Sequence, residues 1–425
     1  MQLAFIGIAT VGLLYFLFQK RQFDFYSIAF FSACVYFLPG FFGYTLMPTK
    51  TSMGSAVDLE NETYMVMIAV LIFILCGGVF FDSCPTKEAI NLRLKGTDNS
   101  AMWTVGIALM GYVLLLYTAG QIILFDDKSA MMMEAVNRWY VVGSTAALLG
   151  AVLSFALGKR LLLCISVCLL AFDVYIGFRT SFAVAMIAIF MLWLGRYGKH
   201  RFAISNWTIG IGGLTFAFFL FLYKQLFAVV KLGLWDILVE RLQDTDLYVD
   251  AIGMSEPFTT QVILNEVIVQ RFEVGISHLK ESLYQLALFS PELGVKPVSF
   301  NDLFQPTLFA TDIEYGMANN IWAEMWSSGG WPLLLAFIAV FVLILGIGSY
   351  LTRALDPTVA AGAAVCFSYW AFYIHRNDLA YQINLEKRVI LIWVICAGLC
   401  ELSSCIRTCA RNSASGRKAV TEPSF

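Results

Sequence analysis

Long apolar blocks, separated by short polar connections, make up most of the chain. A helix needs about 20 apolar residues to cross the roughly 30 Å hydrocarbon core of a bilayer, and most of the blocks are close to that length. Only 14% of the residues are charged, whereas about a quarter are charged in an ordinary soluble domain. No soluble core could hide so much apolar surface. The sequence therefore predicts an all-α polytopic membrane protein.

The apolar blocks predict eleven transmembrane helices. They lie at residues 2–18, 25–43, 64–81, 101–124, 140–157, 161–178, 180–195, 204–223, 331–351, 358–374 and 389–405. The first block lacks a basic leader and an Ala-x-Ala cleavage site, so we expect a retained span and not a signal peptide. The chain then divides into helices 1 to 8 (1–223), a large loop (224–330), helices 9 to 11 (331–410) and a tail (411–425).

Basic residues predict the orientation of these helices, because lysine and arginine accumulate in cytoplasmic loops. They fall on alternate connections: Lys20/Arg21, Lys87/Arg93/Lys95, Lys159/Arg160, Arg196/Lys199/Arg201, Arg353 and Arg407/Arg411/Arg417/Lys418. The N-terminus and the large loop are then expected outside the membrane and the C-terminus in the cytoplasm.

The large loop has helical patterns of its own. Apolar and charged residues alternate at helical spacing over 226–242, which predicts an amphipathic helix on the membrane surface above the bundle. Two further amphipathic helices are expected at 258–273 and 276–289, followed by an irregular stretch at 291–311 that contains prolines. We expect the loop to lie over the bundle as a lid. The polar tail after Arg411 is expected to be disordered.

The charge of the chain and the motifs it lacks argue against several classes of function. The formal charge of −2 comes without any basic patch, so nucleic acid is not an expected partner. The chain contains no Walker A motif, no Gly-x-Gly-x-x-Gly, no Gly-x-Ser-x-Gly and no His-Glu-x-x-His. Cys164 and Cys168 are four residues apart on an expected helix, but no other ligand accompanies them, so no metal site is expected.

Charged residues stand at the outer ends of three expected helices. Arg179 separates two apolar runs and could either mark the membrane boundary or bind a lipid phosphate, whose oxygens match its planar guanidinium. Arg376 stands at the end of the tenth block with Asp378 two residues on, and the same two interpretations apply. Asp173 lies inside an apolar block, where a carboxylate costs about 2.5 to 3.5 kcal/mol unless it is paired, and Arg179 is a possible partner.

A polar stretch also precedes the ninth block. Asn320 and Glu324 are four residues apart, so on a helix both would share one face and could point into a cavity as a general acid or base requires. The alternative is an interfacial belt of aromatic residues with a capping glutamate. The polar residues of the loop helices are individually more typical of a solvated face; they are Glu266, Arg271, Glu273, His278 and Lys280.

The sequence resembles the O-antigen polymerase (Wzy) type of bacterial oligosaccharide repeat-unit polymerases. The resemblance in architecture extends over nearly the whole chain, whereas the local sequence motifs that carry it are short. They are Gly177-Phe178-Arg179 at the opening of a span, the large outer loop with Pro291 to Pro306, the segment from Asn319 and Asn320 through Glu324 to Gly329 and Gly330, and Arg376-Asn377-Asp378-Leu379.

The resemblance implies a multi-pass glycosyltransferase of the GT-C-like class in the bacterial inner membrane, with a periplasmic N-terminus and a cytoplasmic C-terminus. Such enzymes polymerise undecaprenyl-diphosphate-linked repeat units into O-antigen or a related surface polysaccharide. An acceptor hydroxyl attacks the anomeric carbon and lipid diphosphate leaves. Arginines replace a metal ion, so no cofactor is implied. The implied partners are the lipid-linked donor and acceptor, membrane lipid and a chain-length regulator.

Carried over by position, Arg179 and Arg376 would bind the diphosphate, with Arg271 a weaker candidate. Glu324 or His278 would assist the acceptor hydroxyl, and the supporting residues would be Asn320 and Asp378.

The chain departs from the family in lacking paired Arg-x10-Gly repeats in its outer loops, so Arg241 is not carried over. Three alternatives stay open: a ligase-type glycosyltransferase, a transporter or flippase of lipid-linked oligosaccharide that does no chemistry, and a sensor or structural subunit.

Overall fold

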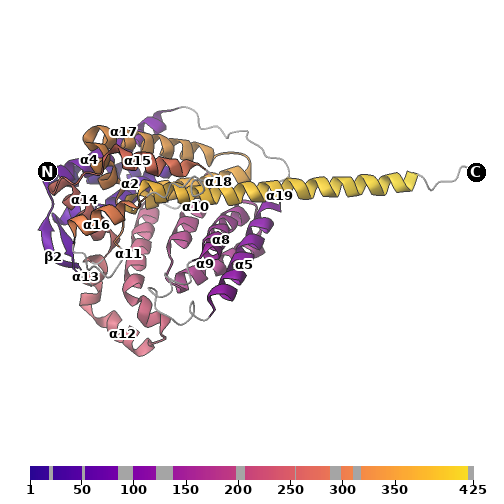
Figure 1. Cartoon of the computed structure of the whole chain (residues 1–425), viewed down its shortest axis with the longest axis horizontal. Coiled ribbons are helices and arrows are strands. Elements are labelled where there is room, and N and C mark those ends of the chain that lie inside the picture. The colour runs from indigo at the N-terminus through magenta and orange to yellow at the C-terminus, as the bar shows by residue number, and fades with distance from the viewer. Residues whose placement is uncertain are drawn as a thin grey trace, which may run out of the picture. The chain divides into compact units, whose positions relative to one another are not determined.

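The computed structural model describes residues 1–18, 23–49, 53–84, 99–120, 137–197, 206–253, 255–287, 298–309 and 317–419. Helices hold most of these residues (Figure 1). Among the described residues, five helical segments are long and apolar enough to cross a membrane: α4 (Asn61–Ser83), α5 (Ser100–Ala119), α8 (Arg138–Ala156), α17 (Ile321–Leu351) and the segment Pro357–Arg376. The predicted helical membrane protein is therefore confirmed.

Within the described residues, each of the eleven predicted blocks contains helical structure, although the number of spans stays a prediction. Besides the helices above, the blocks contain α1 (Gln2–Phe18), α2 (Phe25–Tyr36), α3 (Leu38–Phe42), α9 (Arg160–Tyr175), α10 (Thr180–Tyr197), α11 (Asn206–Lys231), α18 (Pro357–Ser368) and α19 (Leu379–Ala419).

The chain forms two compact units. Unit 1 consists of residues 1–88, 193–351 and 366–387, and unit 2 of residues 89–192, 352–365 and 388–425. Helix starts in both units follow local chemistry. In unit 1 the Asp24 side chain accepts a hydrogen bond from Ser27 N at the start of α2, and in unit 2 Asn137 caps α8 through Trp139 N and Tyr140 N.

The core of unit 1 includes a helix from the large loop. α14 (Glu256–Val269) packs against α2, α4 and α17, and every residue from 257 to 268 is buried. The helix predicted at 258–273 is therefore present, but the solvated polar face expected for it was wrong. Asn265 shows the reason: this buried amide oxygen accepts hydrogen bonds of 2.9 Å from Glu60 N and from Thr63 Oγ1 at the start of α4. This part of the loop is core and not a lid.

A β-hairpin that the sequence did not predict lies next to α14. β1 (Tyr44–Pro48) pairs antiparallel with β2 (Met53–Asp58), and Tyr44 lies opposite Asp58. The Thr45 hydroxyl donates a 2.9 Å hydrogen bond to the carbonyl of Phe258, which ties the hairpin to α14. The connection after the second apolar block is thus folded against the large loop.

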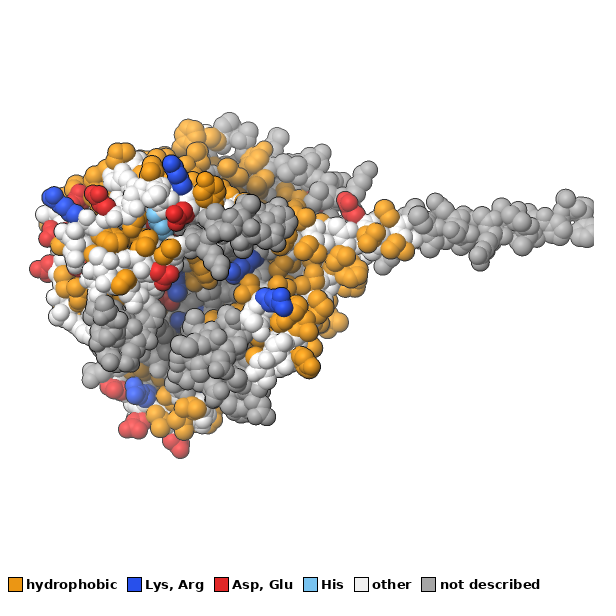
Figure 2. Space-filling model, in the orientation of Figure 1, with side chains coloured by type: hydrophobic (Ala, Val, Ile, Leu, Met, Phe, Trp, Pro, Cys, Tyr) orange, Lys and Arg blue, Asp and Glu red, His pale blue; other side chains and the backbone are white. Residues whose placement is uncertain are grey.

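The rest of the loop corrects two predictions. The single helix expected at 226–242 is two helices, because α11 ends at Lys231 and Gly233 takes a positive φ of 67° before α12 (Trp235–Gln243). α12 has no buried residue, and Figure 2 shows hydrophobic and charged side chains together at its position in Figure 1. α13 (Thr245–Gly253) follows.

The stretch expected to be irregular at 291–311 contains a helix, α16 (Phe300–Leu308), with Pro306 inside it. The apolar residues Phe300, Phe304 and Leu308 are spaced by four and all are buried, so packing of one helix face outweighs the proline. Pro291 lies outside the described residues. The second expected loop helix is present as α15 (Gly275–Leu283), followed by a short 3₁₀ turn, Tyr284–Leu286.

Unit 2 is built on close packing of small residues. α5, α8 and α9 pack against one another (Figure 1). At the crossing of α5 and α8 a Cβ on Gly111 would lie 2.7 Å from Gly143 Cα, so the two backbones touch there and no larger residue fits. This approach brings the residues that follow the glycines, Tyr112 and Ser144, toward α9.

The end of the chain also differs from the prediction. α19 continues as a helix to Ala419, so residues 411–419 are helical instead of disordered, while 420–425 lie outside the described residues. Several of the basic residues that predicted the orientation also lie outside them, namely Lys20, Arg21, Lys87, Arg93, Lys95, Lys199 and Arg201. The orientation stays a prediction.

Candidate functional site

Two interrupted helices meet in unit 1. α17 is broken at Gly329 and Gly330, and the positive φ of 62° at Gly330 is a backbone conformation that favours glycine. The break leaves residues 321–328 as a short helix of their own. α18 loses regular geometry in a π-helical turn (Tyr369–Tyr373) and a 3₁₀ turn (Ile374–Arg376), a type of irregularity that is frequent at functional sites. α19 begins after this irregular segment.

Glu324 lies in the short helix, and its side chain is fully buried. Its Oε1 accepts hydrogen bonds from His278 Nε2 at 3.1 Å and from Ser282 Oγ at 3.4 Å, both on α15. Its Oε2 accepts a 2.7 Å hydrogen bond from the backbone N–H of Leu379, the first residue of α19. The carboxylate thus joins three segments, and neither oxygen is open to a substrate.

His278, on α15, is the hydrogen-bond partner of Glu324. Its ring is 5% exposed, and Nδ1 makes no hydrogen bond to the described part of the chain. Burial lowers the pKa of His278, but the hydrogen bond and charge of Glu324, together with the charges of Asp378 and Glu281, outweigh it, so the pKa is raised. An imidazole oriented by a carboxylate through one nitrogen can exchange a proton at the other. Of the two predicted bases, His278 has the better geometry.

Because its pKa is raised in the folded protein, His278 is expected to make stability depend on pH. The stability that the proton on His278 contributes is fully present below the unfolded pKa of about 6.5 and is lost as the pH rises through the higher folded value. We expect the thermal midpoint of the detergent-solubilised protein to exceed that of His278→Gln by a margin that shrinks as pH rises. A margin that grows with pH would contradict the pairing.

The Asp378 side chain accepts hydrogen bonds from three separate segments of the chain. Its Oδ2 accepts hydrogen bonds from Ser299 Oγ at 2.8 Å and from Asn319 Nδ2 at 3.1 Å. Its Oδ1 accepts one of 2.7 Å from Tyr381 N, as a residue at a helix start does. Asp378 thus holds the start of α19 against the segments around α16, and its supporting role in a substrate site stays a prediction.

Asn320 and Glu324 are one helical turn apart, as the spacing predicted, but their side chains bond to different partners. Asn320 Oδ1 accepts hydrogen bonds from Trp322 N at 2.9 Å and Ala323 N at 3.1 Å, so this residue caps the short helix from just outside. Its Nδ2 donates to the carbonyl of Thr260 on α14 at 2.8 Å. The amide positions the helix that carries Glu324 and does not join the carboxylate.

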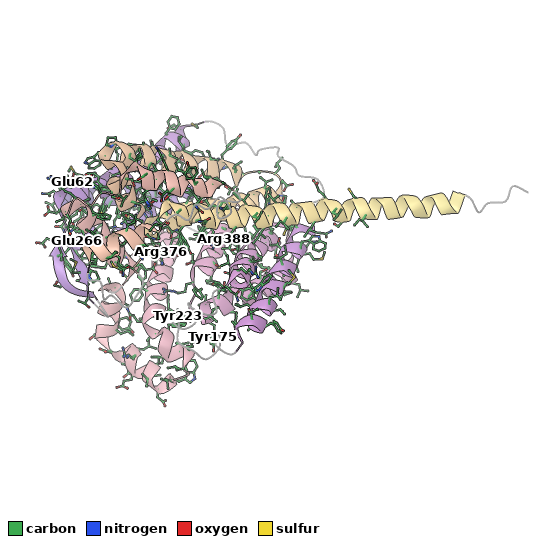
Figure 3. The ribbon with its side chains drawn as sticks, in the orientation of Figure 1. Glu62, Tyr175, Tyr223, Glu266, Arg376 and Arg388 are labelled. Atoms are coloured by element: carbon green, nitrogen blue, oxygen red, sulfur yellow. The ribbon has the colours of Figure 1, made fainter. Side chains whose placement is uncertain are left out.

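Arg376 is held in the irregular segment before α19 (Figure 3). Its guanidinium pairs with the carboxylate of Glu256, lies 4.9 Å over the ring of Tyr373, and keeps 25% of the side chain exposed. Its carbonyl accepts a 3.1 Å hydrogen bond from Asn319 N. The neighbouring carboxylate predicted from the sequence was Asp378, whereas the structure supplies Glu256, which is 120 positions away in the chain.

Of the other predicted arginines, Arg271 makes no contact with this cluster, and Arg179 belongs to the other unit. Arg271 is exposed in a turn after α14, where its φ is +51°, and within the described residues its side chain has no hydrogen bond or ion pair. Arg179 lies between α9 and α10 in unit 2, so its place beside the cluster stays a prediction. It does not pair with Asp173, whose oxygens accept hydrogen bonds from Tyr112 and Ser144 instead.

Several polar residues of unit 1 were missed. Gln382 Nε2 donates to Glu386 Oε1 at 3.0 Å, and Asn377 Nδ2 donates to Gln382 Oε1 at 2.8 Å. A signal existed, because Asp378, Gln382 and Glu386 are spaced by four residues and fall on one face of a helix. His375 was also missed. Its Nδ1 accepts a 3.1 Å hydrogen bond from Trp322 Nε1, which fastens the irregular segment to the short helix.

Within the described residues, no three His, Cys, Asp or Glu side chains are grouped as metal ligands would be. The absence of a metal stays a prediction. Comparison of the chain with models of protein families, with curated proteins and with solved structures gives no match. The geometry of the His278–Glu324 pair is therefore the basis for a functional proposal.

Proposed function

We propose that the chain is a membrane glycosyltransferase that joins undecaprenyl-diphosphate-linked oligosaccharide repeat units into a surface polysaccharide. The observation that carries the proposal is the 3.1 Å contact between His278 Nε2 and the buried Glu324 Oε1. The same protein therefore has an imidazole oriented by a carboxylate and two broken apolar helices. A soluble sugar-nucleotide donor would not require a membrane protein, whereas a lipid-linked donor is presented only at a membrane.

In the proposed reaction His278 is the general base. The acceptor sugar hydroxyl gives its proton to His278 Nδ1 while its oxygen bonds to the anomeric carbon of the donor. The bond from that carbon to the lipid diphosphate breaks, and the diphosphate carries away the electron pair. Glu324 fixes the ring through Nε2 and stabilises the imidazolium that forms, as the carboxylate of a hydrolase triad does. A positioned base of this kind contributes about 10² to 10⁴ to the rate.

Arginine side chains are proposed to neutralise the leaving diphosphate. Arg376 is the better supported candidate, because it stands two residues before Asp378 and remains partly exposed. A diphosphate oxygen would share its guanidinium with Glu256, and the planar group has five donors to divide between them. Arg179 is proposed for the same substrate from its place at a helix boundary, and Arg271 is the weaker candidate.

The proposal includes the finer architecture that the resemblance implies. Eleven spans of the GT-C-like class would place the N-terminus and the large loop in the periplasm and the C-terminus in the cytoplasm of a bacterium. The lipid-linked donor and acceptor and a separate chain-length regulator would be the partners. The broken helices support the proposal because irregular backbone at membrane depth is tolerated where it lines a protein-enclosed site.

Deletion of the gene is expected to leave surface lipopolysaccharide that carries a single repeat unit, because units are still made and attached but no longer joined. Silver-stained gels of the lipopolysaccharide measure this directly. A plasmid copy of the wild type should restore the ladder of long chains. Arg376→Ala, Arg179→Ala and Glu324→Ala, each expressed to the normal level, should not. Long chains in the deletion strain would contradict the proposal.

Arg376→Lys and Arg179→Lys are the matched controls for the diphosphate role. A lysine keeps the charge but not the planar fork, so it should give shorter chains than the wild type. If both lysine variants behave as wild type, the arginines only mark the membrane boundary. Loss of single repeat units as well as long chains in the deletion strain would favour a flippase or a ligase.

A further inference from the structure

A second polar cluster lies in unit 2 and is not used by the proposed reaction. Asp173, on α9, is fully buried. Its Oδ1 accepts a 2.6 Å hydrogen bond from the Tyr112 hydroxyl on α5, and its Oδ2 accepts one of 2.6 Å from the Ser144 hydroxyl on α8. Ser144 Oγ lies 2.7 Å from Ser181 Oγ on α10. The carboxyl group is therefore bonded by hydroxyls from two other helices, and Ser144 connects it to a third hydroxyl on α10.

This cluster lies close to the crossing of α5 and α8. Tyr112 follows Gly111 and Ser144 follows Gly143, and at these glycines the two backbones touch. The ring of Phe172 packs edge-on against the ring of Tyr112, with 5.9 Å between centroids, and closes the site on the side of α9. The cluster is thus closely packed and its carboxyl group is shielded from solvent, the setting in which a charged carboxylate is most costly.

The charges around Asp173 offer it no counter-ion. In the described part of the chain it makes no ion pair, and its hydrogen-bond partners are hydroxyls only. Among the described residues, the titratable side chain that contacts it is Tyr112 from α5, which in turn lies near Tyr140 from α8. Arg179, in the turn after α9, is not its partner. An unpaired ion in such a site costs several kcal/mol, which binding of one proton removes.

The hydroxyl chain has the geometry to deliver that proton. Either serine can be the donor in the contact between Ser144 and Ser181, so the chain can run in both directions. Ser181 lies in the first turn of α10, next to the turn that contains Arg179. We propose that Asp173 is an intramembrane proton-binding site, and that Ser144 and Ser181 form the relay between it and the turn joining α9 and α10.

The relay step is balanced. A water molecule or hydronium ion at the turn gives a proton to Ser181 Oγ, Ser181 gives its own to Ser144 Oγ, and Ser144 gives its own to Asp173 Oδ2. No electron moves, and each hydroxyl ends with one hydrogen. The Tyr112 hydroxyl donates to Oδ1 before and after, so it holds the carboxyl in place in both states. The reverse order releases the proton.

Infrared difference spectroscopy of the purified protein tests the site. The wild type is expected to show the carbonyl stretch of a protonated carboxylic acid, and Asp173→Asn to lose it. Asp356→Asn is the matched control, because Asp356 is also buried in unit 2 but accepts hydrogen bonds from the backbone N–H groups of Thr358 and Val359. That variant should keep the band. Ser181→Ala should keep it as well but slow its exchange in D₂O about tenfold, the size of one hydrogen bond.

Three results would overturn the proposal: no protonated-carboxyl band in the wild type at any pH at which the protein stays folded, a band that persists in Asp173→Asn, and exchange in Ser181→Ala as fast as in the wild type. Should Asp173→Asn fail to fold, Tyr112→Phe replaces it. That variant removes the hydrogen bond to Oδ1 and should shift the band. An unshifted band would assign it to a different carboxyl group and would likewise contradict the proposal.

Discussion

Replacing His278 by alanine is expected to slow glycosyl transfer by about 10²- to 10⁴-fold, the contribution of one positioned general base. The reason is geometric, since Glu324 fixes the ring through Nε2 and leaves Nδ1 without a hydrogen-bond partner in the described chain. The measurement is a single-turnover assay with purified protein and a lipid-diphosphate-linked repeat unit. Added imidazole should restore part of the rate, because the ring it replaces has left a cavity of the same shape.

Lys280→Ala is the matched control, because Lys280 lies on the same helix and is exposed. We expect its rate to equal that of the wild type. The pH profile gives a second test, since only neutral imidazole accepts a proton. The wild-type rate should rise with pH through the raised pKa of His278, in the same range in which the ion pair with Glu324 ceases to stabilise the fold. If His278→Ala keeps more than about a tenth of the rate, His278 is not the base.

The sequence was sufficient to predict a helical membrane protein, because long blocks of apolar residues are suited to lipid and not to water. It was also sufficient to select Glu324, His278 and Asp378 as chemically notable residues. It did not predict that the first two are hydrogen-bond partners. They are 46 positions apart, on helices whose contact depends on tertiary packing alone. The partner of Arg376 was missed for the same reason, since Glu256 carries no local signal that points to it.

Part of the prediction for the large loop was wrong because its polar residues were assumed to lie on solvent-exposed helix faces. In α14 the residues Thr260, Gln261 and Asn265 are polar and buried, and Asn265 and the backbone of Thr260 bond to neighbouring segments. Sequence periodicity reports how apolar a helix face is and not whether its polar groups find partners inside. Asn320 is a similar case, because the same residue type serves as a cap or as a site residue.

Replacing Glu324 by alanine is expected to destabilise unit 1 by about 3 to 5 kcal/mol, the cost of breaking a buried ion pair by removing one partner. The carboxylate is the acceptor for His278 Nε2, Ser282 Oγ and the backbone N–H of Leu379, and its site is fully buried. All three donors would lose their acceptor without water to replace it. Reversible unfolding in mixed micelles measures the free energy of unfolding. Glu281→Ala, an exposed position on α15, should change it by less than about 0.5 kcal/mol.

Glu324→Gln separates the structural role of this residue from its role toward His278. The amide keeps the volume and one oxygen, which can still accept from Leu379 N, so the loss of stability should be nearer 1 to 3 kcal/mol, roughly that of one unmatched polar group. The amide carries no charge to stabilise an imidazolium, so the transfer rate should fall although the protein is folded. A folded Glu324→Gln with the wild-type rate would show that Glu324 holds α15 against α19 and does nothing for His278.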